Sequence, residues 1–521
     1  MKRRDFLKVV GALSAVPSSL VSAAEEAPTQ SQAIVTINTD APSKPYSPMI
    51  FGGFLEHFDN QIYGGVFEPG SPLADKQGFR TDVIGALKEM KVPVIRWPGG
   101  CFVDSYHWRN GVGRQRQPHA DFIWGVMDPN TFGTHEFVEF CRRLGAEPYI
   151  CQNGVAKPQE NVDWVNYCNA TNGPLAEMRK ANGHPEPLNV KFWSVGNERY
   201  DKAHSDRVRD NARAMKNADP TLQITCPFHP GGMRGIASYL LDGSGKHLDY
   251  VSIHEYWLDR GDPLPQYDYM TAISKSEMPE AYMRKGIDSL AKAGHSRLKI
   301  AFDEWNLRAW QHPGFPRGAV ADYEAPEVRA LVEKRRRDND LASQYTLADA
   351  LFSASFLNAC LRHAGQVTMA NIAPLVNTRG PLFVHPGGIV KRTHFHAMAM
   401  YANLLKECVA GVKVDSERLV HGDQSVAVVD ALATVDKSGK RWAIALVNRH
   451  PSKSLACTVM MKDTRLDGTF KATVLAGESA DAYNDIEHLD RVVPKEEQLT
   501  FKNGIANLPP HSLTIVRVSV E

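Results

Sequence analysis

Residues 81–97 read TDVIGALKEMKVPVIRW, a helical pattern followed at once by a buried strand. The apolar residues that recur at the spacing of one helical face are Val83, Ile84, Leu87 and Met90. The run from Val92 to Trp97 is then almost continuously apolar, as in strands that are covered on both faces. This helix–strand unit is the pattern that decides the fold.

The unit recurs along the chain. Apolar runs of strand length lie at 48–54, 92–97, 147–152, 190–197, 222–227, 248–254, 297–304 and 366–373. Buried strands that alternate with helices imply a parallel sheet, and eight of them imply a closed (β/α)8 (TIM) barrel over residues 46–390. A doubly wound open sheet is the rival interpretation, but neither a GxGxxG motif nor a P-loop marks a nucleotide crevice.

After Asn403 the pattern changes from helical stripes to short β runs. These runs lie at 426–433, 442–448, 456–461, 470–475 and 513–520, with turn residues between them. They predict an additional all-β sandwich domain over residues 403–521. Residues 33–45 hold a further strand, so we expect the sandwich to take strands from both ends of the chain.

The first 24 residues differ from the rest. Arg3 and Arg4 precede a modest apolar stretch, Val9 to Val21, which ends at small residues. This predicts a twin-arginine signal peptide cleaved near Ala23 or Ala24, and hence a periplasmic or secreted protein. The alternative is a basic helix start followed by a short core helix, since the stretch is too short to span a bilayer.

Composition narrows the range of partners. Lys and Arg total 60 against 59 Asp and Glu, so no strong field draws the chain to nucleic acid or to a membrane surface. We expect an uncharged partner. The eight cysteines are scattered along the chain without CxxC spacing. This pattern argues against a zinc site and against a dense disulfide framework, but it is compatible with one or two disulfide bonds. No metal or cofactor is expected. The sequence does not decide whether the protein forms a homo-oligomer.

Chemistry-bearing side chains gather where the predicted strands end, and in a parallel barrel the carboxyl ends of the strands form the site. The segments are Glu56-His57, Arg96 to Cys101, Asn197-Glu198, His254 to Tyr256, and Asp303 to Asn306. Glycosidic bond cleavage needs one carboxylic acid to protonate the leaving oxygen and one carboxylate facing the anomeric carbon. Each residue alone could be a solvated cap, an ion-pair partner or a packing group, but their joint placement favours a catalytic site.

Several of these segments resemble glycoside hydrolase family 51, the α-L-arabinofuranosidases. The similar segments are Gly52 to His57, Arg96 to Phe102, Tyr106 to Gly113, Trp193 to Glu198, Phe302 to Asn306 and Leu508 to Ser512. The resemblance covers nearly all of the mature chain. It implies Glu198 as general acid/base, Glu304 as nucleophile, and Glu56, Asn197 and Tyr256 as contacts to a bound arabinofuranose.

Four more residues at the strand ends are candidate substrate contacts: Arg96, Cys101, His254 and Trp305. Cys101 falls where other members of the family have Asn or Cys. Two departures from the family pattern concern the leaving-group side of the substrate: Pro374 stands where a common version has a sugar-binding Gln, and Arg199-Tyr200 is an unusual continuation after the acid/base.

The resemblance implies a retaining, exo-acting α-L-arabinofuranosidase that releases arabinofuranose from arabinan, arabinoxylan or related oligosaccharides. Glu304 must be ionised while Glu198 holds a proton, and retention predicts carboxyl oxygens about 5 to 5.5 Å apart. Two alternatives stay open: an endo-acting β-glucanase or xylanase of the same family, and a carbohydrate-binding protein without catalysis.

Overall fold

The described part of the chain comprises residues 32–40, 43–121, 123–230, 236–258, 268–310, 325–339 and 344–520 of a computed structural model. The predicted signal peptide lies outside these residues. Among the helices described, none is long and apolar enough to cross a membrane.

Each of the eight apolar runs coincides with a strand, although the sixth and seventh strands continue four residues beyond the predicted runs, and the eight strands form one parallel sheet. In sequence order they are β3 (Gly52–Phe54), β4 (Val94–Trp97), β7 (Glu147–Gln152), β8 (Phe192–Val195), β9 (Gln223–Thr225), β10 (Tyr250–Leu258), β11 (Lys299–Arg308) and β12 (Val367–Ile372). Their spatial order is β10-β11-β12-β3-β4-β7-β8-β9. Each barrel strand therefore lies beside the next barrel strand in the sequence, and the last one, β12, lies beside the first, β3.

The sheet closes into a barrel between β9 and β10. Just past β9, Pro227 forms a parallel bridge with Ser252. The Ser252 amide donates to the Cys226 carbonyl at 2.8 Å, and the Asp249 amide donates to the Ile224 carbonyl at 2.9 Å. The predicted (β/α)8 barrel is therefore confirmed, and the open doubly wound sheet is excluded.

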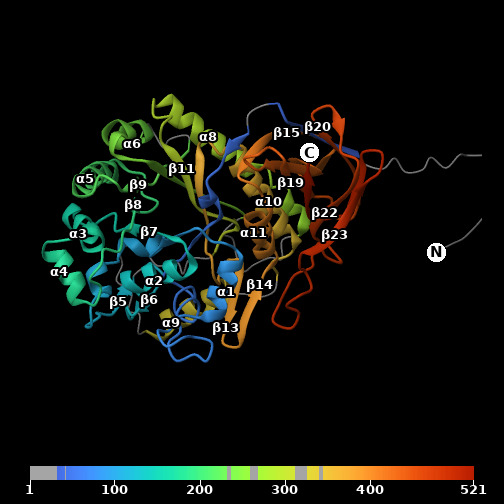
Figure 1. The fold of residues 1–521 in the computed structure, drawn as a ribbon. Coiled ribbons are helices and arrows are strands. Elements are labelled where there is room, and N and C mark those ends of the chain that lie inside the picture. Colours follow the sequence, from blue (N-terminus) through green and yellow to red (C-terminus); the bar gives the residue numbers. More distant parts are fainter. Residues whose placement is uncertain are drawn as a thin grey trace, which may run out of the picture.

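Helices surround this barrel, as Figure 1 shows for the blue-to-green half of the chain. They are α1 (Thr81–Glu89), α2 (Thr134–Leu144), α3 (Pro158–Asn169), α4 (Pro174–Ala181), α5 (Lys202–Ala218), α6 (Ile236–Ser244), α7 (Tyr269–Ile273), α8 (Met278–Lys292), α9 (Pro326–Asn339), α10 (Leu347–Arg362) and α11 (Thr393–Leu404). Helix α2 ends where Gly145 adopts φ 74°, and its amide caps the last turn, so that β7 can start two residues later.

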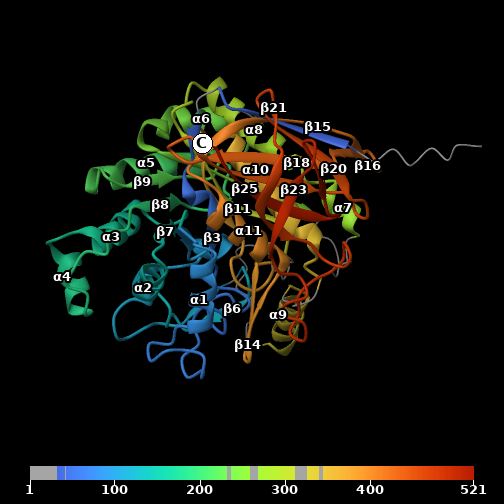
Figure 2. The ribbon, with the colours of Figure 1, turned by 45° about the vertical axis from the view of Figure 1, so that its right-hand side comes forward.

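The second sheet has eleven strands and lies beside the barrel, in orange and red in Figure 2. Its main path is β21 (Thr464–Arg465), β20 (Leu455–Met461), β1 (Gln32–Asn38), β15 (Cys408–Ser416), β18 (Val429–Val435), β19 (Arg441–Asn448), β25 (Ser512–Ser519), β22 (Gly468–Leu475) and β23 (Lys495–Phe501). The strands β2 (Lys44–Pro45) and β24 (Ile505–Leu508) pair with β15 and β20. Buried side chains from both halves of this path share one core, which makes the sheet a sandwich.

Strand β1 is an internal strand of the sandwich, although it begins the described chain. It pairs antiparallel with β15 and parallel with β20. Val35 and Ile37 of β1 are fully buried in the sandwich core. The sandwich is thus assembled from residues near both ends of the sequence.

The predicted run 426–433 is not one strand, and this corrects the sequence analysis. It is divided between β17 (Gln424–Ala427), which forms a hairpin with β16 (Arg418–His421), and β18. Val428 separates them: its amide donates to the Glu417 carbonyl at 2.9 Å, and its carbonyl accepts from the Arg449 amide at 2.8 Å. Two further hairpins, β5 (His119–Asp121) with β6 (Val126–Asp128) and β13 (Leu382–His385) with β14 (Gly388–Lys391), lie in barrel loops.

Helix α10 joins the two domains. Every residue from Leu347 to Leu361 is buried, because the helix packs against barrel strands β11 and β12 and against sandwich strands β18, β19 and β25. Polar bonds tie it to the sandwich: Asn358 donates to Asp430 at 3.0 Å, and Arg449 donates to Ser355 at 2.9 Å. This buried helix therefore helps to hold the barrel against the sandwich.

Candidate active site

The site forms at the carboxyl ends of β4, β8, β10 and β11, and an irregularity in β11 shapes it. Between Phe302 and Trp305, β11 holds one residue more than its partner β12 over the same length of ladder. Strict alternation would send Asp303 and Glu304 to opposite faces. Instead, both carboxylates contact interior groups of the barrel, because the extra residue breaks the alternation.

Glu304 is buried and held by two donors. Its Oε1 accepts a 2.6 Å bond from Arg96 Nη1, and its Oε2 accepts a 2.9 Å bond from the Tyr256 hydroxyl. Burial alone would lower the pKa of Arg96, but the surrounding negative groups, Asp303 and Glu304 among them, raise it well above its ordinary value. Arg96 and Tyr256 thus hold both oxygens of Glu304 in place, as a nucleophile that must be oriented requires.

Glu198 faces Glu304 across the mouth of the barrel. One carboxyl oxygen of each residue and a ring nitrogen of His254 all lie within 4.8 Å of one another. This upper limit agrees with the close approach expected of a retaining enzyme and is below the roughly 6.5–9.5 Å of inverting enzymes. The Glu198 side chain is 23% exposed and that of Glu304 only 4%. Glu198 is therefore the carboxyl group on the open side.

His254 bridges the two glutamates. Its Nδ1 lies 3.1 Å from Glu198 Oε1 and 3.6 Å from Glu304 Oε1, and its Nε2 lies 3.2 Å from Asp303 Oδ1. Burial lowers the pKa of His254, but the charge of Glu304 and the hydrogen bonds with Asp303 and Glu198 outweigh burial and raise it to about 10. His254 thus lies as an imidazolium among three carboxyl groups of the site, and its role as a substrate contact stays a prediction.

The raised pKa of His254 predicts a pH-dependent contribution to stability. The pKa rises from 6.5 to about 10 on folding, so the contribution is full below pH 6.5 and is lost as the pH rises through 10. We expect His254→Asn to lower the melting temperature more at pH 6 than at pH 10, by on the order of 5 °C. Thermal unfolding of both proteins at the two pH values checks this. An equal difference at both values would contradict the charged state.

Glu56 lies at the bottom of the site and is fully buried. Its Oε1 accepts from the Phe102 amide at 2.8 Å and from Trp124 Nε1 at 3.0 Å. Its Oε2 has no hydrogen-bond partner within the described ranges. Burial, with the charge of Glu304, raises the pKa of Glu56 well above its ordinary value. An unsatisfied buried oxygen of this kind is suited to a ligand hydroxyl.

Gly99 and Gly100 leave the space that these carboxyl groups occupy. A Cβ on Gly100 would lie 2.8 Å from Glu304 Oε1, and a Cβ on Gly99 would lie 2.2 Å from Glu56 Cγ. Gly99 also has φ 138°, which other residues rarely adopt. The glycine pair is therefore required by the site and is more than a turn.

Asn197 and Cys101 complete the inner face of the site. Asn197 Oδ1 accepts from Arg96 Nη2 at 2.7 Å, and its Nδ2 lies 3.8 Å from Cys101 Sγ. Cys101 is partly exposed, and no disulfide joins any of the eight cysteines, all of which lie within the described ranges. The structure thus brings Glu56, Arg96, Cys101, Asn197, Glu198, His254, Tyr256 and Glu304 together at one end of the barrel.

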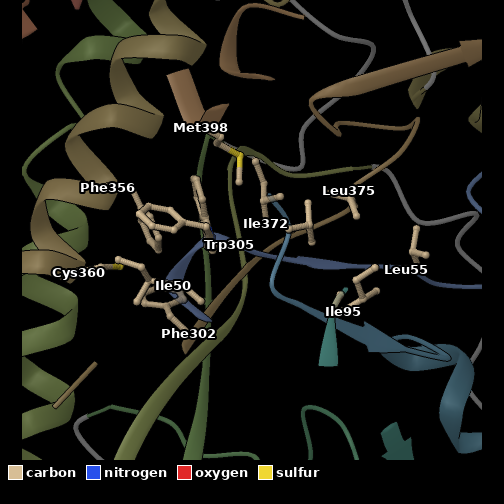
Figure 3. Close-up of a cluster of buried hydrophobic side chains, with 14 of the residues drawn as sticks. Ile50, Leu55, Ile95, Phe302, Trp305, Phe356, Cys360, Ile372, Leu375 and Met398 are labelled. Atoms are coloured by element: carbon tan, nitrogen blue, oxygen red, sulfur yellow. The ribbon is translucent and has the colours of Figure 1, made fainter. Parts of the chain in front are cut away.

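Trp305 is the exception, and its assignment as a substrate contact is wrong. Its side chain is buried, and its ring stacks on Phe356 of α10 with centroids 3.7 Å apart. Figure 3 shows the two rings face to face within the apolar cluster between barrel and helix. The irregularity that turns Asp303 and Glu304 inward leaves Trp305 facing outward, so it packs the core behind the nucleophile.

Three aromatic residues that the sequence analysis did not select line the site instead. Trp124 stacks on Phe58 with centroids 4.0 Å apart, and Trp310 lies 5.6 Å from Phe58 and 4.9 Å from Tyr256. Phe58 follows directly after Glu56-His57, and Trp310 comes four residues after Asn306, so both lie close to segments that the sequence had singled out. Trp124 comes from the β5–β6 hairpin, to which no strand pattern pointed.

The nearest ligand atoms of Glu198, His254 and Glu304 are close enough to share one ion. Arg96, which contacts Glu304, already supplies one positive charge there.

Comparison with known proteins gives consistent matches. The model of the "alpha-L-arabinofuranosidase 1 domain" matches residues 86–257, and that of the "alpha-L-arabinofuranosidase C-terminal domain" matches residues 303–512.

A probable α-L-arabinofuranosidase C from Aspergillus niger is 31% identical, and the match covers 90% of this chain and 94% of that protein. An intracellular exo-α-(1→5)-L-arabinofuranosidase from Halalkalibacterium halodurans is 28% identical, over 89% of this chain and 90% of its own. The crystal structure of the GH51 α-L-arabinofuranosidase from Thermotoga petrophila is 29% identical, with a TM-score of 0.82 over 94% of this chain and 100% of that one.

Proposed function

The chain belongs to the α-L-arabinofuranosidases of glycoside hydrolase family 51, and we propose that Glu304 is its nucleophile and Glu198 its general acid/base. The enzyme cleaves arabinofuranosides with retention at the anomeric carbon. The observation that supports this pair best is the approach of their carboxyl oxygens to within 4.8 Å in different surroundings.

In the first step, a carboxylate oxygen of Glu304 forms a bond to the anomeric carbon as the bond to the leaving oxygen breaks. The Glu198 proton moves to that oxygen. Arg96 and Tyr256 each hold one oxygen of Glu304, so the attacking carboxylate is oriented before substrate arrives. The product is a β-linked arabinosyl ester of Glu304 and a free alcohol.

In the second step, Glu198 takes a proton from water, whose oxygen attacks the anomeric carbon and releases Glu304 as a carboxylate. Two inversions give net retention. His254 Nδ1, which lies 3.1 Å from Glu198 Oε1, helps to hold this carboxyl group in place. Asn197 and Glu56 present polar atoms toward the sugar from the inner face of the pocket.

The natural substrate that we propose is a terminal α-linked arabinofuranose of arabinan, arabinoxylan or a related oligosaccharide. The relative from Halalkalibacterium halodurans is named for exo action on α-(1→5) linkages. Glu56 is fully buried and accepts a hydrogen bond from Trp124 Nε1, so the inner end of the site is closed by protein, which suits exo action.

A panel of 4-nitrophenyl glycosides tests this function. We expect turnover of the α-L-arabinofuranoside, with α-arabinofuranose as the first anomer that NMR detects. Preference for aryl β-cellobioside or β-xylobioside would support the endo-acting alternative. Binding of arabino-oligosaccharides without turnover of any glycoside would support the non-catalytic one, and β-arabinofuranose as first product would contradict retention.

We also propose that the enzyme acts in the periplasm or outside the cell, on the strength of Arg3-Arg4 and the apolar stretch after them. We expect the double substitution Arg3→Lys, Arg4→Lys to leave active enzyme in the cytoplasm, because the barrel does not depend on the signal. Fractionation of cells with an arabinofuranosidase assay measures this. The control, Lys2→Ala, keeps both arginines and should still be exported. Normal export of the double variant would contradict the proposal.

A further inference from the structure

The acid/base residue stands in a conformation that needs outside support. Strand β8 ends at Val195, and the next residues turn sharply, with φ 77° at Gly196 and φ 44° at Glu198. A left-handed backbone is unfavourable for a residue with a side chain and persists only where its surroundings fix it. The contacts on either side of Glu198 therefore decide where its carboxyl group points.

On the preceding side, the turn is fixed by the core of the site. The Gly196 amide donates to the Gln152 carbonyl at 3.0 Å. Asn197 accepts from Arg96 and reaches toward Cys101, as described above. A Cβ on Gly196 would lie 2.6 Å from the ring of His204, so the turn also rests directly on α5.

On the following side, the support is an ion pair. Arg199 Nε and Nη2 both donate to Asp104 Oδ2, at 3.0 and 2.7 Å. Asp104 belongs to the 3-10 helix η2 (Cys101–Asp104), which follows β4, and its side chain is 9% exposed against 32% for Arg199. The Asp104 carbonyl also accepts from Asn153 Nδ2 at 3.2 Å. Asp104 thus belongs to a segment that is itself held by Asn153, the residue that follows β7.

We propose that the Asp104–Arg199 pair is a positioning device for the acid/base, and this rests on the proposed role of Glu198. Asn197 contacts Cys101 at the start of η2, and Arg199 bonds to Asp104 at its end. Glu198 lies between these two contacts in the sequence. Without the pair, the backbone that follows Glu198 loses its ion-pair anchor to η2. Its carboxyl group then meets the leaving oxygen less often, while Glu304, held by Arg96 and Tyr256, stays in place.

A series of substrates with different leaving groups distinguishes positioning of the acid/base from a purely structural role or from binding of the leaving sugar. The probes are 2,4-dinitrophenyl, 4-nitrophenyl and phenyl α-L-arabinofuranosides with Arg199→Ala and Asp104→Asn. We expect kcat/KM to fall about 30-fold on the phenyl substrate and less than about 3-fold on the dinitrophenyl one, which hardly needs protonation. On the dinitrophenyl substrate, kcat and KM should fall together, because base-assisted hydrolysis of the ester slows.

Matched variants keep the test clear of folding effects. Arg199→Lys keeps the charge and should recover part of the loss on the phenyl substrate. Arg209→Ala removes a comparable ion pair on α5, between Arg209 and Asp206 at 2.9 Å, and should change neither substrate. Melting temperatures identify variants that fold poorly, in which case the milder Asp104→Asn decides.

Three outcomes would overturn the proposal: equal loss on all aryl substrates, no loss on any, or loss only on oligosaccharides, which would mean that Arg199 binds the leaving sugar itself. Glu198→Ala is measured in parallel. If it shows the leaving-group dependence and Arg199→Ala does not, only the positioning role fails. If Glu198→Ala shows none either, the assignment of the acid/base fails first.

Discussion

Replacing Glu304 with alanine is expected to lower kcat on every arabinofuranoside by on the order of 10⁵-fold, whatever the leaving group. Both chemical steps pass through this carboxylate, so a better leaving group cannot compensate for its loss. Steady-state rates on dinitrophenyl and phenyl substrates measure the effect. A residual rate that rises steeply with leaving-group quality would contradict the assignment.

Azide provides the control for Glu304→Ala. A small anion can enter the space left by the side chain and displace the leaving group once, so an α-linked substrate should give β-arabinofuranosyl azide. Removing Glu304 leaves the buried Arg96 with Asp303 as its remaining carboxylate neighbour, with Nε at 3.4 Å from Oδ2. Because an underpaired buried charge is destabilising, Glu304→Gln is the milder comparison.

Replacing Glu198 with alanine is expected to give a loss that depends on the leaving group. On phenyl or oligosaccharide substrates, kcat/KM should fall by about 10³-fold or more, because the leaving oxygen is no longer protonated. On the dinitrophenyl substrate it should change by less than about 10-fold, since that alcohol leaves as an anion. The arabinosyl ester should then accumulate, which a burst of dinitrophenolate would reveal.

Azide should rescue this variant with the opposite stereochemistry. It attacks the β-linked ester of Glu304 in place of the water that Glu198 would activate, and the second inversion gives α-arabinofuranosyl azide. The two variants therefore yield opposite anomers from one substrate, which NMR distinguishes. The same anomer from both would mean that the roles have been assigned wrongly.

The sequence predicted the barrel well, because its strands are buried on both sides and stand out as apolar runs. Sandwich strands were harder. Strand β23 was missed, since it is the last strand of its sheet and only Phe501 among its residues is buried. The break between β17 and β18 at Val428 was also missed, because the residues on both sides of it are apolar. A hydrophobic pattern shows neither that a strand lies at the edge of a sheet nor that a strand is interrupted locally.

Site residues were predicted where strand ends carry them, and missed where loops or irregular strands do. Glu198 follows β8 and Glu304 lies within β11, and the apolar runs before them led to both. Trp305 was misassigned, because an extra residue in β11 changes which side chains face inward, and sequence alternation cannot show this. Trp124 reaches Glu56 from a hairpin loop, and only the folded chain reveals that approach.

The position of β1 has a consequence for the order of events during synthesis. Its hydrogen-bonding neighbours, β15 and β20, end at Ser416 and Met461, so its ladder cannot form until most of the polypeptide has left the ribosome. Strand β1 must wait while the barrel strands are made. Pairing of such distant residues is entropically costly and slow. Insertion of β1 is therefore expected only after the whole barrel has been synthesised.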